Sequence, residues 1–332
     1  MKIVCDLPGV ARDKNSVATI GTFDGVHRAH QEIIREVVNR ARMREGRSVV
    51  ITFDPHPKEI VASPKGGEVR LLSTIEERIA LFEKLNVDLL FSIPFTLEFS
   101  RLNPHEFYER YVVNGVGVSE VVVGYDHMFG RDREAGIGEL VKIGREFDFS
   151  VFAVHPYTVV GEAVSSTRIR RALASGDLLR AETMLGYPYR LSGRVVRGDG
   201  RGKTIGFPTA NVSPDSFRKI IPARGVYLVG AEARGRRLYG MMNIGVRPTV
   251  TAGVAETAEV HLFDFSGELY GETVTVTFLR RLRDEQRFTN VEELVRQLAR
   301  DREYALRILA DQTKQDIQVP STMKHKGDQE WQ

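Results

Sequence analysis

Two histidines stand three residues apart in the stretch Gly21–His30, which also carries two glycines and an aspartate. The stretch follows an apolar, strand-like segment and opens a helical pattern, so free backbone N–H groups and the helix dipole would favour an anion there. The spacing places His27 and His30 on one face of the first helical turn. Bonded to a phosphate, the two imidazoles could stabilise charge that develops during in-line attack, without a covalent nucleophile.

Two other interpretations of this histidine pair are open. An i, i+3 pair could ligate zinc, although the HExxH spacing is absent and Cys5 is the only cysteine in the chain. The histidines could also be ordinary solvated residues at a helix cap. Taken alone, the pair does not decide between phosphate binding and these alternatives.

A second glycine-dense stretch, Gly198–Asn211, also follows a strand-like segment. Its tripeptide Gly202–Thr204 ends like a phosphate-binding P-loop. Arg197 stands where the first glycine of that motif is required, and Pro208 prevents the helix that should follow. The P-loop interpretation therefore fails.

The same stretch ends in polar residues that a plain glycine hairpin does not explain. Thr209 offers a hydroxyl oxygen and Asn211 an amide oxygen. Both are hard donors suited to Mg²⁺ that is shared with ATP phosphates.

The segments that must position the first stretch alternate between two patterns. Apolar, β-rich runs, which predict buried strands, occupy 16–21, 47–53, 87–93, 119–124 and 149–154. Helical patterns lie between them at 31–46, 74–86 and 103–115. Such alternation predicts an α/β fold with a doubly wound parallel sheet. In the last helix we expect Asn103 as N-cap, Pro104 and Glu106 in the first turn, and Gly115 as the stop.

The pattern changes after Pro188. Short strands separated by Gly, Pro and Asp turns are predicted at 189–197, 225–233, 236–245, 258–265 and 272–282. Several such strands in about a hundred residues indicate a small antiparallel β-barrel. One amphipathic helix is predicted over 291–310, and the polar, aperiodic residues 313–332 are predicted to be disordered.

The composition is that of an ordinary globular protein: 332 residues, 42% hydrophobic and 27% charged, with a net charge of +3. This length predicts two domains, at about 100–200 residues each. The charge suits a pocket for phosphorylated ligands but lacks the basic stripe of a nucleic-acid-binding protein. Because we find no signal peptide and no apolar run of the roughly 18–20 residues that span a membrane, we expect a cytoplasmic protein.

The stretch Gly21–His30 resembles the G-x-F-D-G-x-H-x-G-H signature of bacterial FAD synthetases, within the HxGH nucleotidyltransferase superfamily. Segments 52–57, 124–130 and 165–170 match the same family in order. The resemblance implies adenylylation of FMN by ATP, with His27 and His30 as catalytic residues. It implies contacts to ATP and its phosphates from Gly21, Phe23, Asp24, Gly25, Ser165, Ser166, Thr167 and Arg170. It implies contacts to the flavin from Asp126, His127 and Phe129.

Two residues depart from this family pattern. Ala29 replaces a glycine and adds a methyl where the resemblance implies a close approach of the backbone to the nucleotide. His127 replaces a usual Phe and offers less area for stacking. Both favour an alternative, a riboflavin kinase with a weakened or inactive adenylyltransferase domain.

The stretch Gly198–Asn211 resembles the G-x-G-R-G-x-x-x-G-F-P-T-A-N motif of riboflavin kinases, and the resemblance continues through 243–249, 259–261, 269–271 and 282–288. It implies phosphorylation of riboflavin by ATP with Mg²⁺, and Glu259 as the general base. It implies ATP contacts from Gly198, Gly200, Gly202, Lys203, Pro208 and Thr209, flavin contacts from Arg283 and Glu285, and Mg²⁺ ligation by Thr209 and Asn211.

We therefore expect an adenylyltransferase domain over 1–185, a riboflavin kinase domain over 186–312 and a tail over 313–332. The expected partners are ATP, riboflavin and FMN, with neither nucleic acid nor membrane. A flavin-binding regulator without ATP turnover is a third alternative, against which Thr209, Asn211 and Glu259 argue.

Overall fold

The computed structural model describes residues 1–332 except 62–68, 126–127, 129–135, 199, 249–253 and 319–332. The chain forms two compact units. One comprises Met1–Ser175, Leu179–Tyr187 and Ser216–Ile220. The other comprises Gly176–Leu178, Pro188–Asp215 and Ile221–Gln332.

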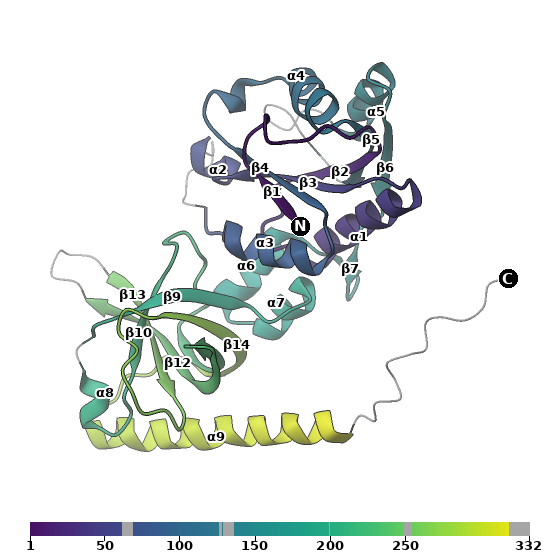
Figure 1. Cartoon of the computed structure of the whole chain (residues 1–332). Helices are drawn as coiled ribbons and strands as arrows, with labels where there is room; N and C mark the ends of the chain where they lie inside the picture. Colours follow the sequence, from purple (N-terminus) through teal and green to yellow (C-terminus); the bar gives the residue numbers. More distant parts are fainter. Residues whose placement is uncertain (62–68, 126–127, 129–135, 199, 249–253, 319–332) are drawn as a thin grey trace. The chain divides into compact units, whose positions relative to one another are not determined.

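The first unit contains a six-stranded, wholly parallel sheet in the order β1-β4-β3-β2-β5-β6 (Figure 1). The strands are β1 (Lys2–Val4), β2 (Ser16–Ile20), β3 (Ser48–Asp54), β4 (Leu89–Pro94), β5 (Val118–Gly124) and β6 (Ser150–Val154). Five of them were predicted from the sequence; β1 was not. A two-stranded ribbon, β7 (Thr158–Val159) and β8 (Glu162–Ala163), follows β6.

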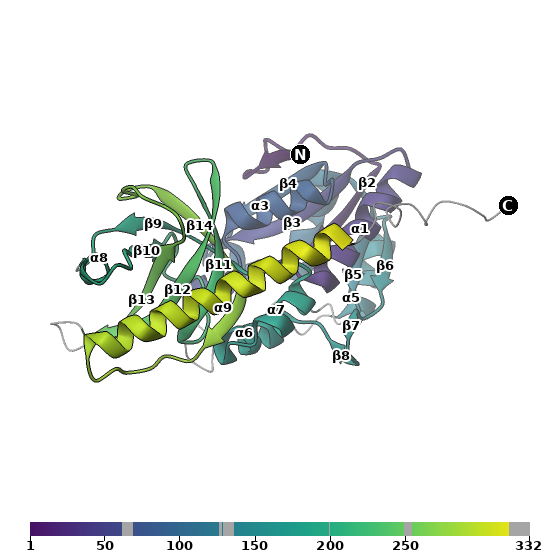
Figure 2. The same ribbon diagram turned by 90° about the horizontal axis from the view of Figure 1, so that it is seen from below.

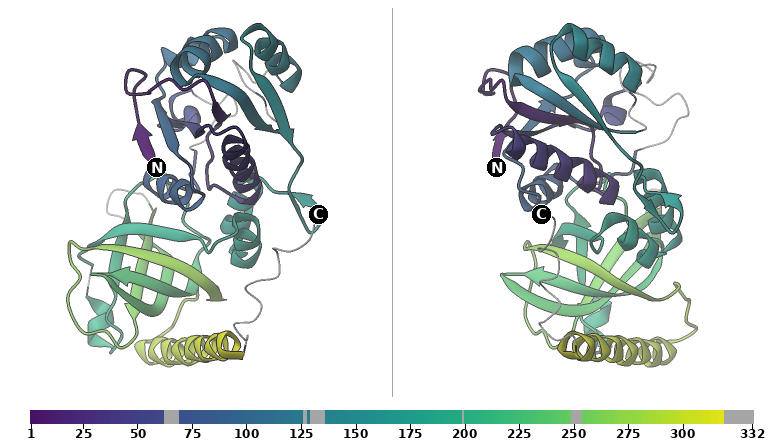
Figure 3. Two further views of the ribbon diagram at one scale, coloured as in Figure 1. Left: turned by 45° about the vertical axis from the view of Figure 1, so that its right-hand side comes forward. Right: turned by 90° about the vertical axis from the view of Figure 1, so that its right-hand side faces the viewer.

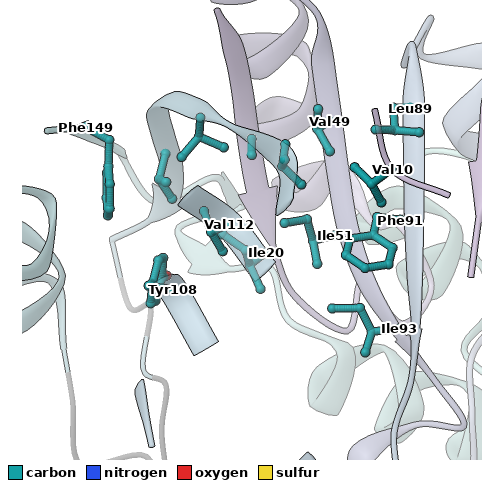
Figure 4. Close-up of a cluster of buried hydrophobic side chains, with 14 of the residues drawn as sticks. Val10, Ile20, Val49, Ile51, Leu89, Phe91, Ile93, Tyr108, Val112 and Phe149 are labelled. Carbon is teal, nitrogen blue, oxygen red and sulfur yellow. The ribbon is translucent and has the colours of Figure 1, made fainter. Parts of the chain in front are cut away.

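Helices cover both faces of the sheet because alternate residues of each buried strand point to opposite faces. On one face, Val50 packs with residues of α1 (Arg28–Met43) and α3 (Ile75–Lys84), and Val122 packs with residues of α1. On the other, Ile20 and Val123 belong to a cluster with residues 108–116 and with α5 (Ile137–Glu146); Figure 4 shows part of it. The predicted doubly wound arrangement is confirmed.

The predicted start of the helix at Asn103 is confirmed, and its predicted stop is wrong. The Asn103 side chain accepts from the Glu106 N–H, and the Glu106 side chain accepts from the Asn103 N–H, so α4 (Pro104–Phe107) begins with a capping box. The helix continues as a π-helical segment, Tyr108–Val116. It ends at Gly117, whose φ of 84° is the left-handed conformation that glycine adopts without strain.

Further helical segments connect these elements in the first unit. They are α2 (Pro57–Ile60), a 3₁₀ turn (Phe99–Arg101), α6 (Ser166–Ser175) and α7 (Leu178–Leu185), whose first residue belongs to the second unit.

The second unit is a closed barrel (Figure 3). Its strands follow the order β10-β13-β12-β11-β14-β9, and every neighbouring pair is antiparallel. Its strands are β9 (Arg190–Val196), β10 (Ala210–Pro214), β11 (Gly225–Ala233), β12 (Arg236–Pro248), β13 (Val254–Leu262) and β14 (Thr273–Arg283). A one-turn helix, α8 (Arg201–Thr204), lies between β9 and β10.

The last helix, α9 (Val291–Gln318), is longer than predicted (Figure 2). It packs on β12 and β14 of the barrel. The sequence holds no proline or glycine between Ala310 and Gln318, so nothing breaks the helix there. The prediction of disorder from residue 313 is therefore wrong up to Gln318; residues 319–332 lie outside the described part of the chain.

Candidate active sites

The first stretch singled out by the sequence leaves the sheet where the strand order reverses. From β2 the chain proceeds through β3 and β4 on one side, and then returns to place β5 and β6 on the other side of β2. In open α/β sheets, ligands bind outside the carboxyl ends of the strands at such a switch point. Gly21 follows β2 at that point.

The loop after β2 has an unusual backbone. Phe23, Gly25 and Val26 have φ values of 47°, 82° and 33°. A Cβ on Gly25 would lie 2.9 Å from a Leu72 side-chain carbon, so glycine is required there both by conformation and by space. Such backbone conformations cost free energy of folding and occur mainly at functional sites, so they mark this loop as a candidate site.

Asp24 is the centre of the hydrogen bonds that hold this loop. Its carboxylate, which is 3% exposed, accepts from the N–H of Leu72 at 2.9 Å and of Ser73 at 3.0 Å. The Gly25 N–H donates to the Ser73 hydroxyl at 2.7 Å. Buried backbone groups of the loop are therefore paired with one neighbouring segment.

His27 and His30 lie together as predicted. Their rings stack with centroids 3.5 Å apart, and the His30 N–H donates to Nδ1 of His27, the N-cap residue of α1, at 3.4 Å. Burial, reinforced by the Arg170 charge, lowers the pKa of His27 to about 3. Burial and then His27 lower the pKa of His30 well below its ordinary value. Both imidazoles are neutral at pH 7.

The two competing interpretations of the pair find no support. A solvated cap is wrong for His27, which is 4% exposed. Nowhere in the described part of the chain do three His, Cys, Asp or Glu side chains gather as a metal site would require. Nδ1 of His30 is buried and finds no hydrogen-bond partner among the described residues.

The start of α6 meets the same loop. Ser165 accepts from the Arg168 N–H through its hydroxyl, and the Ser166 hydroxyl donates to the Asp24 carbonyl at 3.0 Å. Arg170 forms an ion pair with the Asp24 carboxylate. Thr167 is exposed in the first turn. The structure thus brings Asp24, Ser166 and Arg170 together from segments more than 140 residues apart.

Two buried side chains at this site were not assigned a role from the sequence. His56, the N-cap of α2, is 6% exposed; burial lowers its pKa to about 4, with the nearby Asp24 carboxylate opposing the shift. Arg78 of α3 donates to the Thr22 carbonyl and the Thr52 hydroxyl, both at 2.9 Å. His56 stood in a matched motif and could have been found; Arg78 stood in an ordinary helical pattern.

The predicted flavin contacts of this unit, Asp126, His127 and Phe129, lie outside the described residues.

In the barrel, strand register aligns three polar residues. Asn211 of β10 and Asn243 of β12 both pair with Glu259 of β13, so the three side chains stand in a row across adjacent strands. The Thr209 hydroxyl donates to the Glu259 carboxylate at 3.4 Å. Asn243 belongs to a motif that the sequence identified, but only the register places it beside Glu259.

Glycines of the loop before β10 make room for this row. A Cβ on Gly198 would lie 2.0 Å from Nδ2 of Asn211. A Cβ on Gly202 would lie 2.3 Å from the Phe207 carbonyl oxygen and 3.2 Å from the Thr209 hydroxyl. The loop can therefore lie against both polar side chains only because these positions are glycine.

The other predicted ATP contacts are on the same loop. Gly200, with φ of 70°, caps α8, in which Lys203 is exposed. The Pro208 carbonyl lies 2.8 Å from Nδ1 of His261 and accepts a hydrogen bond from it when the proton of the imidazole is on Nδ1. His261 also contacts the Phe207 ring edge-on, which fits a structural role.

The predicted flavin contacts of the barrel lie at the end of β14 and after it. Nε of Arg283 binds both carboxylate oxygens of Asp301, at 3.1 and 2.9 Å, and Asp301 is a buried residue of α9. The Glu285 carboxylate lies 2.7 Å from the position of a Cβ on Gly245. Arg283 thus anchors α9 to β14, a role that the sequence did not suggest.

The two units define a class of protein. The first is a nucleotidyltransferase-type α/β unit with a neutral histidine pair at its switch point, and the second is a flavokinase-type barrel with a Thr, Asn and Glu cluster. The family model described as FAD synthetase matches residues 10–168, and the model described as riboflavin kinase matches residues 185–309.

Similar proteins carry both halves in one chain. A bifunctional riboflavin kinase/FMN adenylyltransferase from Listeria monocytogenes is 37% identical over 87% of this chain and 91% of its own. The protein of that name from Escherichia coli K12 is 38% identical over 88% of this chain and 92% of its own. The one from Pseudomonas fluorescens is 40% identical over 85% of this chain and 89% of its own.

A solved structure from Streptococcus pneumoniae, named a macrolide-efflux protein, superposes with a TM-score of 0.81 over 92% of this chain and 98% of its own, at 34% identity. In the chain described here, no helix within the described ranges has the length and apolar character needed to cross a membrane.

The chain belongs to the family of bifunctional riboflavin kinase/FMN adenylyltransferases. It is an enzyme that converts riboflavin to FMN and FMN to FAD.

Proposed function

We propose that each unit carries one of the two reactions, and that the two clusters described above are their active sites. The observation that carries this proposal is that each cluster lies within one unit and, except for Arg170, within the range matched by one family model. In domain terms we assign residues 1–185 to FMN adenylylation and 186–312 to riboflavin phosphorylation.

In the first unit, the loop Gly21–His27 and the start of α6 bind the phosphates of ATP. Nδ1 of His27 accepts a hydrogen bond, so the proton of this neutral imidazole is on Nε2, which can donate to a phosphate oxygen. A phosphate oxygen of FMN attacks the α-phosphorus of ATP, and the bond to pyrophosphate breaks. Arg170 and the imidazole N–H groups stabilise the charge on the phosphoryl oxygens.

The neutral state of the histidines matters for this role. A neutral imidazole donates a hydrogen bond from one nitrogen and adds no charge to the site. The charged groups beside the histidines are Arg170 and Asp24, which form an ion pair. Two imidazolium ions stacked at 3.5 Å would repel each other strongly. The structure favours catalysis by positioned hydrogen-bond donors over general-acid catalysis by His27 or His30.

In the second unit, Glu259 takes the proton of the riboflavin 5′-hydroxyl as its oxygen attacks the γ-phosphorus of ATP and ADP leaves. In the strand register Glu259 stands between Asn211 and Asn243, and its carboxylate accepts from the Thr209 hydroxyl. The glycines of the preceding loop let the backbone approach the phosphates.

The donor set of this cluster fits Mg²⁺. Thr209 and Asn211 supply neutral oxygen atoms and Glu259 a carboxylate, with Thr209 and Glu259 already within 3.4 Å. Mg²⁺ bound with ATP usually takes one or two protein ligands and completes its shell with phosphates and water. When bound, the ion neutralises phosphate charge. Thr209 and Asn211 are the residues that would hold it.

The alternative of an inactive first domain is not favoured. The FAD synthetase model matches residues 10–168, and the contacts of Asp24, His27 and Arg170 are in place. A cytoplasmic location and the absence of nucleic-acid partners remain predictions from the sequence.

One assay that separates riboflavin, FMN and FAD tests the division of labour. With Mg²⁺ and ATP, we expect Asn211→Ala to abolish FMN formation from riboflavin and to preserve FAD formation from FMN. We expect His30→Ala to do the reverse. If either substitution abolished both reactions in folded protein, the picture of two separate sites would be wrong.

A further inference from the structure

Five residues that follow β10 in the sequence, Ser216–Ile220, are part of the first unit. The Leu71 N–H donates to the Arg218 carbonyl at 2.7 Å, and the Ile220 N–H donates to the Leu71 carbonyl at 2.9 Å. In sequence, this segment lies inside the range that matches the riboflavin kinase model. A piece of kinase-matching sequence is therefore built into the unit to which we assign adenylyl transfer.

Lys219 is the buried residue of this segment that carries a charge. It is 4% exposed, and its Nζ donates to the Leu72 carbonyl at 2.7 Å and to the Glu77 carboxylate. The same Glu77 oxygen accepts from the Thr74 N–H at 2.9 Å, in the capping box of α3. A buried ammonium group is tolerated only where such partners compensate it, so the position of Lys219 fixes that of its partners.

The segment that Lys219 holds is the one that holds the phosphate loop. While the Leu72 carbonyl accepts from Lys219, the Leu72 N–H donates to Asp24, and so does the N–H of Ser73. The Ser73 hydroxyl in turn accepts from the Gly25 N–H. The carbonyl that accepts from Lys219 and the Ser73 N–H that donates to Asp24 belong to the same peptide group.

We propose that Lys219 is a positioning residue for adenylyl transfer: it fixes Leu72 and Ser73 so that these residues hold Asp24 and Gly25 in the conformation that binds ATP. The inference rests on the proposed role of the loop in ATP binding. It assigns to the kinase-matching half of the sequence a residue that serves the other reaction.

The substitution Lys219→Met keeps most of the length of the side chain and removes its donor. We expect the KM for ATP in FAD formation to rise at least about tenfold, because the loop loses its fixed geometry. The KM for FMN and the rate of riboflavin phosphorylation should stay within twofold of the wild-type values. Lys142→Met is the matched control, because it removes an exposed Lys–Glu pair, that of Lys142 with Glu139.

A second variant separates positioning from stability. Lys219→Met leaves the Glu77 carboxylate without its buried partner, which by itself destabilises the fold. The double variant Lys219→Met/Glu77→Gln removes that charge. We expect its melting temperature to recover towards the wild-type value while the KM for ATP stays raised.

The inference is overturned if the KM for ATP is unchanged in Lys219→Met, or if it returns to the wild-type value in the double variant. The second result would mean that Lys219 serves only to neutralise Glu77. A wild-type chain that forms no FAD from FMN would contradict the proposed function itself, and this inference with it.

Discussion

Replacing Gly198 by alanine tests the kinase site without removing any group that takes part in the chemistry. The added Cβ would lie 2.0 Å from Nδ2 and 2.7 Å from Cγ of Asn211, whereas ordinary van der Waals contact begins at 3.4 Å. The Asn211 amide or the loop must therefore move by roughly 1.4 Å. A displacement of about 1 Å in a positioning group can lower a rate about 100-fold. We expect a loss of that order in kcat/KM for riboflavin phosphorylation.

The barrel offers a matched control for this substitution. Gly230→Ala in β11 adds the same methyl where the nearest heavy atom, Cβ of Thr277, is 4.0 Å away. Steady-state formation of FMN from riboflavin gives the kinase rate. Formation of FAD from FMN by the same preparation, together with the melting temperature, reports whether the chain remains folded.

A double-mutant cycle then tests the cause of the loss. Because Asn211→Ala is itself expected to abolish FMN formation, the cycle is measured as the free energy of unfolding in urea. If the methyl acts by displacing the Asn211 amide, Gly198→Ala should destabilise the Asn211→Ala chain less than the wild type, because the group it displaces is already gone. The reasoning is refuted if Gly198→Ala keeps a kinase rate within threefold of Gly230→Ala, or if Gly198→Ala lowers the free energy of unfolding equally in both backgrounds.

Three further predictions concern single residues. Gly25→Ala adds a methyl 2.9 Å from Leu72, at a residue whose φ is 82°. The steady-state rate of FAD formation should fall about 100-fold or more, while riboflavin phosphorylation persists. The control is Gly138→Ala, whose methyl meets nothing within 4 Å. Glu259→Gln should lower the kinase kcat by about 10²–10⁴-fold with a KM for riboflavin within threefold, and an unchanged kcat would exclude it as general base. Folding holds the pKa of His56 at about 4. Between pH 6.5 and 4, His56 is therefore protonated in the unfolded chain and neutral in the folded chain. Because the unfolded chain binds the extra proton, the free energy of unfolding falls as the pH falls. Urea unfolding at pH 7 and pH 4.5 should show a smaller decrease for His56→Gln than for the wild type, by up to about 3 kcal/mol; equal decreases would contradict the assigned pKa.

Most of the fold could be predicted because the buried strands are long apolar runs with helical patterns between them. The failures have local causes. The strand Lys2–Val4 has three residues, too few for any period, and forms only through pairing with β4. The sequence predicts the helix stop at Gly115 rather than at Gly117 because two glycines two residues apart look alike in sequence. Only the backbone conformation distinguishes them, since Gly117 has positive φ.

The register of the barrel could not be predicted at all. A pattern of alternating residues shows that a strand is half-buried, but a shift of two residues in pairing would leave that pattern unchanged. Such a shift would move Asn243 away from Glu259. The row of Asn211, Glu259 and Asn243 is therefore a property of the folded barrel, even though each residue stood in a motif.

The residues that form the two sites can be recognised in the sequence, whereas the residues that support the sites cannot. Phosphate-binding loops need glycines and polar side chains close together in the chain, so the sequence alone predicts where both sites lie. Arg78, Lys219 and Asp301 instead hold those loops or strands from ordinary helical or loop segments. Each has a single recognisable property, a charge that is buried and paired, and burial is defined only by the tertiary structure. Lys219 is the extreme case: its partners are more than 140 residues away in sequence, joined to its segment through Leu71. A substitution of Lys219 should affect adenylyl transfer, although all the motifs of that reaction lie elsewhere in the chain. The position of a residue in the sequence therefore does not decide which of the two activities its substitution affects.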